Sequence, residues 1–459
     1  MPFALEIIAV SGHPVPESET ETFTSFGGGD DGPALNALGQ VAFRALTSGG
    51  QGVFATRSRM LQTVARTGDP VPDGAATFAS FGNPTVNDAG ELAFFGSFEG
   101  TEGVFATRRG RLRKLAQIGD PVPGSSSGET FTAFDGPIPL LNIAGDVAFR
   151  GLFDGGEGVF VTHRDRLRVV ARTGQHVPGT AAGETFDGFS RPVLNDSAQV
   201  AFTAAFGDAS GIFLGEKRQV TLLARTGQPT DGTMFAEFSR PALNGAGDVA
   251  FSASFGALRG VFVIREHLLQ TVVQTGDPLP GTTDAFFVSA SRPALNRPGD
   301  VAFEAVFGNG GAGIDALLLA RPNGLMIVHQ EESGEPTLFD MVVNDRGDIA
   351  FELSDIDSVL LVTRDGESMP VPSDRRLEFR PGDVRVLERA DLLSGDGKFV
   401  YAGNGDGLAS GFNNEGQVGF LAQAGPSAET GPVSAIVLAT PEPGVRLISR
   451  PRPFPSRTS

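Results

Sequence analysis

The sequence predicts an all-β protein, a closed β-propeller built from four-stranded blades. Three observations support this fold class. An Asn-x-x-Gly-x-Val-Ala-Phe motif recurs along the whole chain, each copy holds four short segments rich in β-branched and aromatic residues, and the two chain ends resemble two parts of one repeat. Apolar residues at helical spacing are not sustained, so strands are favoured over helices.

The motif asparagine marks the repeat. It occurs eight times, at steps of 51, 55, 53, 49, 52, 48 and 69 residues. A nearly constant period of this length is typical of repeat architectures. The long last step indicates an insertion within Asp365–Leu408. The eight copies stand at Asn36, Asn87, Asn142, Asn195, Asn244, Asn296, Asn344 and Asn413.

Each copy divides into four expected strands. The first runs into the asparagine, as in "SRPALN" before Asn244, and the second is "GDVAFSA", Gly247–Ala253. The third contains "GVFATR", at Gly52 and at Gly103, and the fourth is "LQTVARTG", Leu61–Gly68. These segments are short and bounded by Gly, Pro and Asn, as strands are. The unit is therefore expected to be an antiparallel meander.

The Asn-x-x-Gly motif is expected to form the turn between the first two strands. Asparagine can bond its own backbone two residues on, and glycine can adopt positive φ at the end of a turn. In six copies a proline stands three residues before the asparagine, as Pro241 does before Asn244. Proline lacks an N–H, so it is placed at a strand start or edge.

A Phe-x-x-Phe pair follows the fourth strand and "TGDPVP". The sequence predicts this stretch to be the crossover from one sheet to the next, with both rings wedged between sheets. Burying each ring is worth about 2–3 kcal/mol. The pairs are Phe23/Phe26, Phe78/Phe81, Phe131/Phe134, Phe186/Phe189 and Phe235/Phe238.

The termini predict how the array closes. The last unit lacks a fourth strand, whereas the chain begins with "ALEIIAVSGHPVP", Ala4–Pro16, which matches "LQTVARTGDPVP", Leu61–Pro72. The N-terminal strand is therefore expected to complete the last blade. Eight blades are predicted, with seven as the alternative because Glu367–Gly411 fits the pattern poorly. Residues 1–440 would form one propeller, and residues 441–459 a disordered Pro/Arg-rich tail.

The amino-acid composition restricts the kinds of partner and covalent link that this chain can have. The chain has 36 basic and 54 acidic residues, a net charge of −18, which disfavours nucleic acid and anionic membrane surfaces. It has no cysteine, so disulfides and thiolate ligands are excluded. No apolar run is long enough for a membrane span, and "MPFALEIIAVSGHPVP" lacks the features of a signal peptide. A monomer without a cofactor is expected.

The repeated motif, together with "ARTGDPVP" and "GVFATR", resembles a bacterial tandem-repeat family named for N-x-x-G-x-x-A-F. The resemblance covers residues 3–439. It implies a secreted or surface-anchored propeller with a variable C-terminal anchor and no agreed catalytic residues. Thr440–Pro443, "TPEP", is similar to the start of a Pro-Glu-Pro sorting signal, although no apolar helix follows it. An extracellular or cell-surface location is therefore expected.

Metal and catalytic chemistry are weakly indicated. The five histidines share no spacing. Asp146, Asp248, Asp300 and Asp348 occupy one place in the repeat, but other copies have Gln or Glu there, which favours a turn cap over a calcium ligand. The "GNGDG" stretch at Gly403 lacks a preceding acidic ligand. No metal site and no catalytic residue are assigned.

The sequence thus favours a non-catalytic binding or structural module whose partner is an acidic polysaccharide or another protein. The alternative is a carbohydrate-active enzyme, a glycoside hydrolase or polysaccharide lyase, which would need carboxylates converging from different blades. One candidate ligand site stands out. Arg191, Arg240 and Arg292 each lie four residues before the motif asparagine in three consecutive copies. They are predicted to line the central channel and to bind a carboxylate or sulfate.

Overall fold

The structure is a computed structural model, and it describes residues 3–370 and 413–441 apart from short gaps. The gaps are residues 27–31, 126–127, 164–165, 181–182, 231–232, 281, 283, 310–312, 323, 331–337, 354–357, 363–367, 414, 416 and 428–430. The described residues form strands and turns and contain no helix, so the all-β prediction is confirmed. The predicted tail beyond Pro441, the "GNGDG" stretch and all of Asp365–Leu408 except Ser368–Pro370 lie outside the described residues.

Repeated antiparallel sheets make up the fold, numbered here sheet 1 to sheet 7 in chain order. Sheet 1 contains β2 (Phe23–Phe26), β3 (Ala34–Leu35), β4 (Val41–Thr47), β5 (Gly50–Arg57) and β6 (Met60–Arg66). Sheet 2 contains β7 (Phe78–Phe81), β8 (Thr85–Val86), β9 (Leu92–Phe98), β10 (Thr101–Arg108) and β11 (Arg111–Gln117). Sheet 3 contains β12 (Phe131–Leu141), β13 (Val147–Phe153), β14 (Gly156–His163) and β15 (Arg166–Arg172).

The next sheets repeat this order. Sheet 4 contains β16 (Gly188–Phe189), β17 (Val193–Leu194), β18 (Val200–Phe206), β19 (Ala209–Glu216) and β20 (Gln219–Arg225). A hairpin of β21 (Pro229–Thr230) and β22 (Thr233–Met234) precedes sheet 5, which contains β23 (Glu237–Phe238), β24 (Ala242–Leu243), β25 (Val249–Phe255), β26 (Leu258–Arg265) and β27 (Leu268–Gln274).

The C-terminal part adds two more sheets of the same kind and one that joins the chain ends. Sheet 6 contains β28 (Phe286–Leu295), β29 (Val301–Gly308), β30 (Ile314–Arg321) and β31 (Gly324–Gln330). Sheet 7 contains β32 (Leu338–Val343), β33 (Ile349–Leu353), β34 (Ser358–Val362) and β35 (Ser368–Pro370). The terminal sheet contains β36 (Val418–Ser427), β37 (Gly431–Pro441) and β1 (Phe3–Val10).

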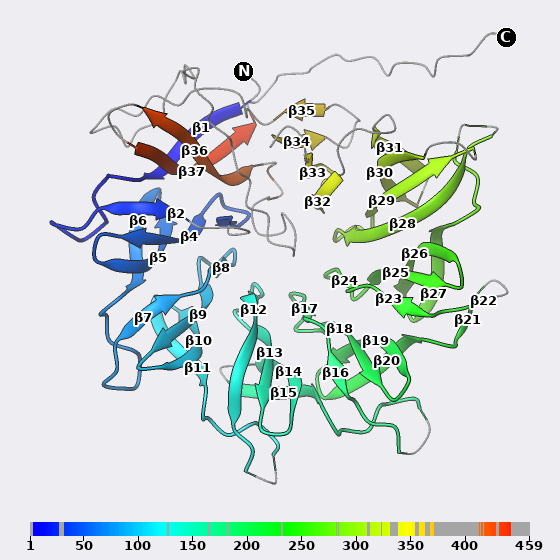
Figure 1. The fold of residues 1–459 in the computed structure, drawn as a ribbon, viewed down its shortest axis with the longest axis horizontal. Coiled ribbons are helices and arrows are strands. Elements are labelled where there is room, and N and C mark those ends of the chain that lie inside the picture. The colour runs from blue at the N-terminus through cyan, green and yellow to red at the C-terminus, as the bar shows by residue number, and fades with distance from the viewer. Residues whose placement is uncertain are drawn as a thin grey trace.

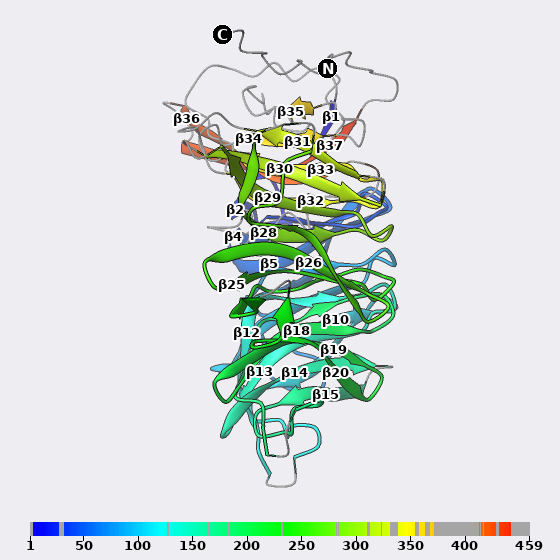
Figure 2. The ribbon, with the colours of Figure 1, turned by 90° about the vertical axis from the view of Figure 1, so that its right-hand side faces the viewer.

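The sheets follow one another around a common centre, with the short strands β8, β17 and β24 near that centre (Figure 1). Seen from the side, most strands run across the thickness of the molecule (Figure 2). The strand order within each sheet therefore runs from the centre outward, and β6, β11, β15 and β20 lie at the outer edge.

The prediction that the Phe-x-x-Phe pair forms a crossover is wrong. In sheets 1 to 3 both rings belong to the first strand of the following sheet, and in sheets 4 and 5 the second ring does, Phe189 in β16 and Phe238 in β23. This first strand is split in sheets 1 and 2: β2 and β3 both pair with β4, and β7 and β8 both pair with β9. In sheets 3 and 6 the two pieces are continuous as β12 and β28, with a register shift between them. The proline before the motif lacks an N–H, so it stands at the start of the second piece.

The same phenylalanines nevertheless pack between sheets. Phe78 and Phe81 share a cluster with Ala34, Val53 and Ala65 of sheet 1. In sheets 1 to 5 the first ring of the pair meets the ring of the "GVF" or "GIF" segment edge to face, at centroid distances of 4.9–5.0 Å. Such pairs contribute about 0.5–1.5 kcal/mol beyond the burial of area.

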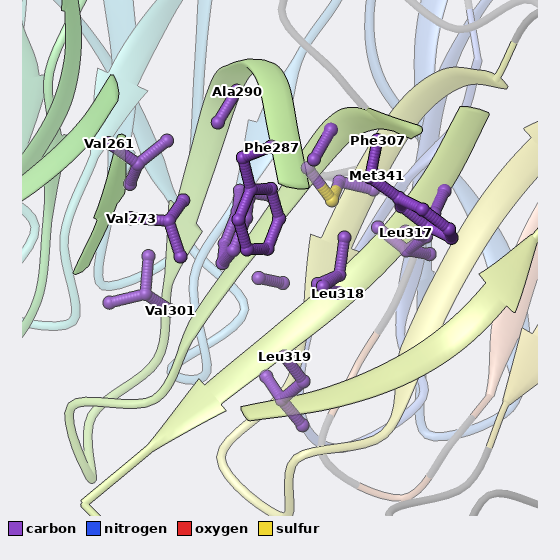
Figure 3. Packing of buried hydrophobic residues seen from close by; sticks show 14 of the residues in the cluster. Val261, Val273, Phe287, Ala290, Val301, Phe307, Leu317, Leu318, Leu319 and Met341 are labelled. Carbon is purple, nitrogen blue, oxygen red and sulfur yellow. The ribbon is translucent and has the colours of Figure 1, made fainter. Parts of the chain in front are cut away.

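Apolar clusters join neighbouring sheets along the described chain. Sheets 5, 6 and 7 share one cluster, to which β26, β27, β28, β30 and β32 contribute side chains (Figure 3). The terminal sheet packs on sheet 1, because Ile8, Ile436 and Leu438 cluster with Phe23 and Phe43. Each of these sheets is buried by its neighbours, so both faces of a strand can be apolar.

The N-terminal strand lies in the same sheet as the last strand. β1 pairs antiparallel with β37, from Phe3↔Pro441 to Val10↔Ala435, with a bulge between Ile7 and Ala9. The amide of Ser11 also donates to the carbonyl of Ser434 at 2.9 Å. The first and last described strands are thus hydrogen-bonded to each other.

The motif asparagine organises its turn as predicted. In the fifth copy the Oδ1 of Asn244 accepts from the amides of Ala246 and Asp248, at 3.0 and 2.9 Å. Its Nδ2 donates to Asp248 Oδ2 at 3.0 Å. Gly247 has φ of +91°, which confirms the predicted positive φ at the end of the turn, although the fourth copy has Ala198 at this place with φ of +58°.

The second Nδ2 hydrogen of each asparagine links one copy to the next. It donates to the carbonyl of the following motif asparagine at 2.8–3.2 Å. The last of these bonds runs from Asn413 to the carbonyl of Asn36, 377 residues apart in sequence. All eight asparagines are buried, with 3–6% exposure. These eight residues and their bonds are called the asparagine ring below.

Deleting residues 1–12 should lower the thermal midpoint and cause self-association. The deletion removes β1, leaves the β37 edge unpaired and exposes apolar side chains around Ile436 and Leu438. Differential scanning fluorimetry and size-exclusion chromatography measure the two effects, and Glu6→Gln is the control. An unchanged midpoint with monomeric elution of the deleted protein would contradict the assigned role of β1.

Gly247→Val should destabilise the protein more than Asp248→Ala, by about 1–3 kcal/mol, because a β-branched residue is strained at positive φ. A Cβ at Gly247 would also lie 2.9 Å from Gln199 Oε1. Urea unfolding measures both variants. Equal shifts of the two midpoints would show that the backbone conformation of Gly247 is not what limits this position.

Asn195→Asp should cost about 1–3 kcal/mol, because it replaces a donor that faces the carbonyl of Asn244 with a buried acceptor. Asp196→Asn, in the adjacent and more exposed position, is the matched control and should change stability by less than about 1 kcal/mol. Urea unfolding of both variants decides the matter: similar losses would mean that the inter-sheet amide bond is dispensable.

Candidate functional site

The three predicted arginines occupy the same structural position in three consecutive sheets. Arg191 lies between β16 and β17, and Arg240 lies between β23 and β24. Arg292 lies in β28, where the register with β29 shifts between Ser291 and Ala294. Each therefore stands at the break of the first strand of its sheet.

In sheets 4 and 5 the hydroxyl of the serine that precedes the arginine makes hydrogen bonds at this break. Ser190 Oγ accepts from the amide of Thr203 at 2.9 Å and donates to the carbonyl of Arg191 at 3.3 Å. Ser239 Oγ does the same with Ser252 and Arg240, at 2.9 and 3.1 Å. The hydroxyl takes the place of a missing ladder bond and holds the backbone of the arginine.

The three side chains differ in their surroundings. The Nη2 of Arg240 donates to the carbonyl of Pro192 in sheet 4 at 3.2 Å, and Arg191 lies against Gly136 in sheet 3. Arg292 pairs with Glu304 at 3.4 Å, and its side chain is 57% exposed. Its backbone has φ of +48°, an uncommon conformation for a residue other than glycine. The arginines of sheets 4 and 5 thus lean toward the preceding sheet, whereas Arg292 is the most accessible.

A second charged group, centred on Arg150 in β13, was not predicted from the sequence. Its guanidinium donates to Asp135 and to Glu157. Burial alone would lower the pKa of Arg150, but the hydrogen bonds and charges of Glu157 and Asp135 raise it above its usual range. Glu157 Oε1 also accepts from the amide of Phe189 in sheet 4 at 2.7 Å. Glu157 therefore links sheet 3 to sheet 4, whereas Asp135 pairs with Arg150 within sheet 3.

Residues equivalent to Glu157, which stand just before the "GVF" segment in other copies, can also link neighbouring sheets. Gln51 Oε1 accepts from the amide of Phe81 in sheet 2 at 3.1 Å. Glu102 stands at the same place in its copy, and burial raises the pKa of its carboxyl group. Aligning the copies as "QGVF" and "EGVF" could have identified this position as a recurring polar contact.

The carboxylates considered as calcium ligands support the turns instead. Arg265 donates to the carbonyl of Gly299 in the next turn and lies 3.8 Å from Asp248. Arg321 lies 3.8 Å from Asp300. Where Gln199 replaces the carboxylate, its amide donates to Glu216, which replaces the arginine, at 3.3 Å. In the first copy, however, Gln40 holds this place although the third strand ends in Arg57, so glutamine here does not require glutamate at the strand end.

The described residues offer neither a cluster of metal ligands nor a membrane-spanning helix. Among the described residues, no group of three or more His, Asp or Glu side chains is placed to hold a metal ion. His163 Nδ1 lies 3.4 Å from Asp146 Oδ2, in the place that arginine takes in other copies. Within the ranges given above, no helix has the length and apolarity needed to cross a membrane.

Comparison with solved structures finds several distant likenesses. Virginiamycin B lyase from Staphylococcus aureus is 14% identical, with a TM-score of 0.33 over 73% of this chain and 96% of that one. Sqt1 from Saccharomyces cerevisiae is 13% identical, with a TM-score of 0.39 over 91% and 98%. Prolyl oligopeptidase B from Galerina marginata is 9% identical, with a TM-score of 0.41 over 91% of this chain and 55% of that one.

No curated protein matches the sequence. One family model does, over residues 3–210 and 156–316, which together span more than half of the chain. These two overlapping matches begin at β1 and end in β30, so they include the first six motif asparagines. The chain belongs to the family of unknown function DUF7453.

Proposed function

We propose that this protein is a closed, eight-bladed β-propeller that serves as a non-catalytic binding module. Two contacts between the chain ends support closure: β1 pairs with β37, and the terminal sheet packs on sheet 1. The asparagine ring supports eight blades over seven, because Asn344 bonds to Asn413 and Asn413 bonds to Asn36. Residues 1–440 would then form a single domain.

The observation that carries a binding function is the recurrence of arginine at one break in three neighbouring first strands. First strands line the central channel of a propeller. Guanidinium groups from Arg191, Arg240 and Arg292 would then face one arc of that channel in a protein of net charge −18. Paired N–H donors of arginine match the oxygens of a carboxylate or sulfate. The ligand would be a small anion or an acidic sugar.

The alternative, a glycoside hydrolase or polysaccharide lyase, has less support. Asp135 and Glu157, two carboxylates that share a partner, are both held by Arg150. A glycosidase needs its two carboxyl groups on either side of the scissile bond.

The cellular part of the proposal rests on the sequence. The resemblance to the N-x-x-G-x-x-A-F repeat family favours a secreted or cell-surface protein. A monomer is proposed, with an acidic polysaccharide or another protein as its partner.

Isothermal titration with uronic-acid tetrasaccharides and with sulfate tests the ligand site. The wild-type protein should bind, and the Arg191→Ala/Arg240→Ala/Arg292→Ala variant should bind at least about tenfold more weakly, because charge-assisted hydrogen bonds are lost. The matched control replaces three exposed arginines that lie away from these first-strand breaks, Arg259, Arg297 and Arg346, with alanine. It should bind as the wild type does.

Two results would overturn the proposal. One is the absence of binding by the wild type, or equal loss in both triple variants. The other is catalysis, seen as new reducing ends or unsaturated products when the protein is incubated with a panel of polysaccharides.

A further inference from the structure

Basic residues are concentrated in four equivalent segments of this acidic chain. Residues 57–66, 108–117, 163–172 and 216–225 contain 15 of the 36 Lys and Arg residues but 2 of the 54 Asp and Glu residues. The rest of the chain keeps 21 basic and 52 acidic residues. The four segments therefore carry a net charge of +13, against −31 for the remainder.

These segments occupy the same place in sheets 1 to 4. Each contains the end of the third strand and the whole of the outermost strand: β6, β11, β15 or β20. Strand β11 contacts β15, and β15 contacts β20. Arg168 also donates to the carbonyl of Lys217 at 3.5 Å, from sheet 3 to sheet 4. Between sheets 1 and 2, a Cβ at Gly110 would lie 3.9 Å from Arg57 Nη1. The basic segments of neighbouring sheets are thus adjacent in space.

Exposed cations define this outer basic surface. Its members are Arg59, Arg109, Arg111, Arg166, Lys217 and Arg218, all exposed. Lys217 pairs with Glu216 at 3.1 Å. The five arginine side chains form no ion pair with any residue that the structure describes. Their charges therefore remain available to a partner.

Protection of sheet edges does not explain the pattern. Charged residues on outer strands can prevent edge-to-edge pairing, but this need is the same in every sheet. The outer strand β27 of sheet 5, "LLQTVVQ", has no charged residue, and its Leu268 is 64% exposed. The outer strand β31 of sheet 6, "GLMIVHQ", has no Lys or Arg. The basic residues of sheets 1 to 4 are therefore additional to what the fold requires.

We propose that the outer basic surface binds an extended acidic polysaccharide, one that carries sulfate or uronic acid groups. A surface spread over four sheets fits a linear polyanion better than a single small anion. The negative charge of the remaining chain would repel the polymer elsewhere and so direct it to this surface. The four basic segments contain no Phe, Tyr or Trp, whereas single-stranded nucleic acid is held by stacking on aromatic rings. This surface is separate from Arg191, Arg240 and Arg292.

Binding of fluorescent dextran sulfate, measured by anisotropy at increasing salt, tests the proposal. Wild-type affinity should fall as salt rises, because exposed charges are screened. Arg109→Gln/Arg111→Gln/Arg166→Gln should lose about tenfold in affinity, since each exposed contact contributes modestly. The control variant, Arg259→Gln/Arg297→Gln/Arg346→Gln, makes the same change in net charge at exposed positions in later sheets. It should retain most of the affinity.

Neutral dextran should not bind. Adding the outer triple substitution to the Arg191→Ala/Arg240→Ala/Arg292→Ala variant should lower the affinity of that variant for dextran sulfate further. Absence of dextran sulfate binding by the wild type, or equal losses in the outer and control triples, would overturn the proposal. Tighter binding to single-stranded DNA or to vesicles with 30% phosphatidylserine, abolished by the outer triple, would overturn the assignment to polysaccharide. Circular dichroism melts confirm that the variants are folded.

Discussion

The buried amide of the motif asparagine is the interaction on which the other contacts depend. Each amide uses both acceptor and both donor positions in copies such as the fifth, and one donor reaches the carbonyl of the next copy. A buried amide left without these partners would cost about 1–3 kcal/mol. Since a side chain of fixed length must span from sheet to sheet, the asparagine ring sets their spacing at the inner turns, and the phenylalanine clusters fill the widening space outside it.

The residue four places after each motif asparagine varies, and its variation shows what the turn requires. The fourth residue after it must accept a hydrogen bond from Nδ2, a requirement that Gln40, Asp248 and Gln417 all meet. The end of the third strand carries arginine beside Asp248 and glutamate beside Gln199, but it also carries arginine, Arg57, in the copy with Gln40. Charge at this position is therefore secondary to hydrogen-bonding capacity, and a carboxylate there is no sign of a metal site.

The sequence could predict two kinds of feature: those that arise from the local chemistry of a few residues, and those that follow from the spacing and comparison of the repeats. The period, the glycine at positive φ in the turn and the likeness between Ala4–Pro16 and a fourth strand are of this kind. The Phe-x-x-Phe segment was misassigned, because a strand interrupted before a proline resembles a loop. The inter-sheet bond of the asparagine and the Arg150 group could not be foreseen, since both depend on the relative placement of separate sheets. Comparison of the repeats identified Arg240 as a recurring arginine, but it could not predict the hydrogen bond from Arg240 to the carbonyl of Pro192.

A repeated frame separates structural from functional positions by comparison within one chain. The asparagine ring and the ring pairs of phenylalanine make the same demands of every sheet they join, so a residue pattern restricted to some sheets does not come from the frame. Two such patterns exist: arginine at the first-strand break of sheets 4 to 6, and basic outer strands in sheets 1 to 4. One lies toward the centre and the other at the rim, so each can change without disturbing the buried amides. Both proposed binding surfaces therefore lie where substitutions leave the turns unchanged.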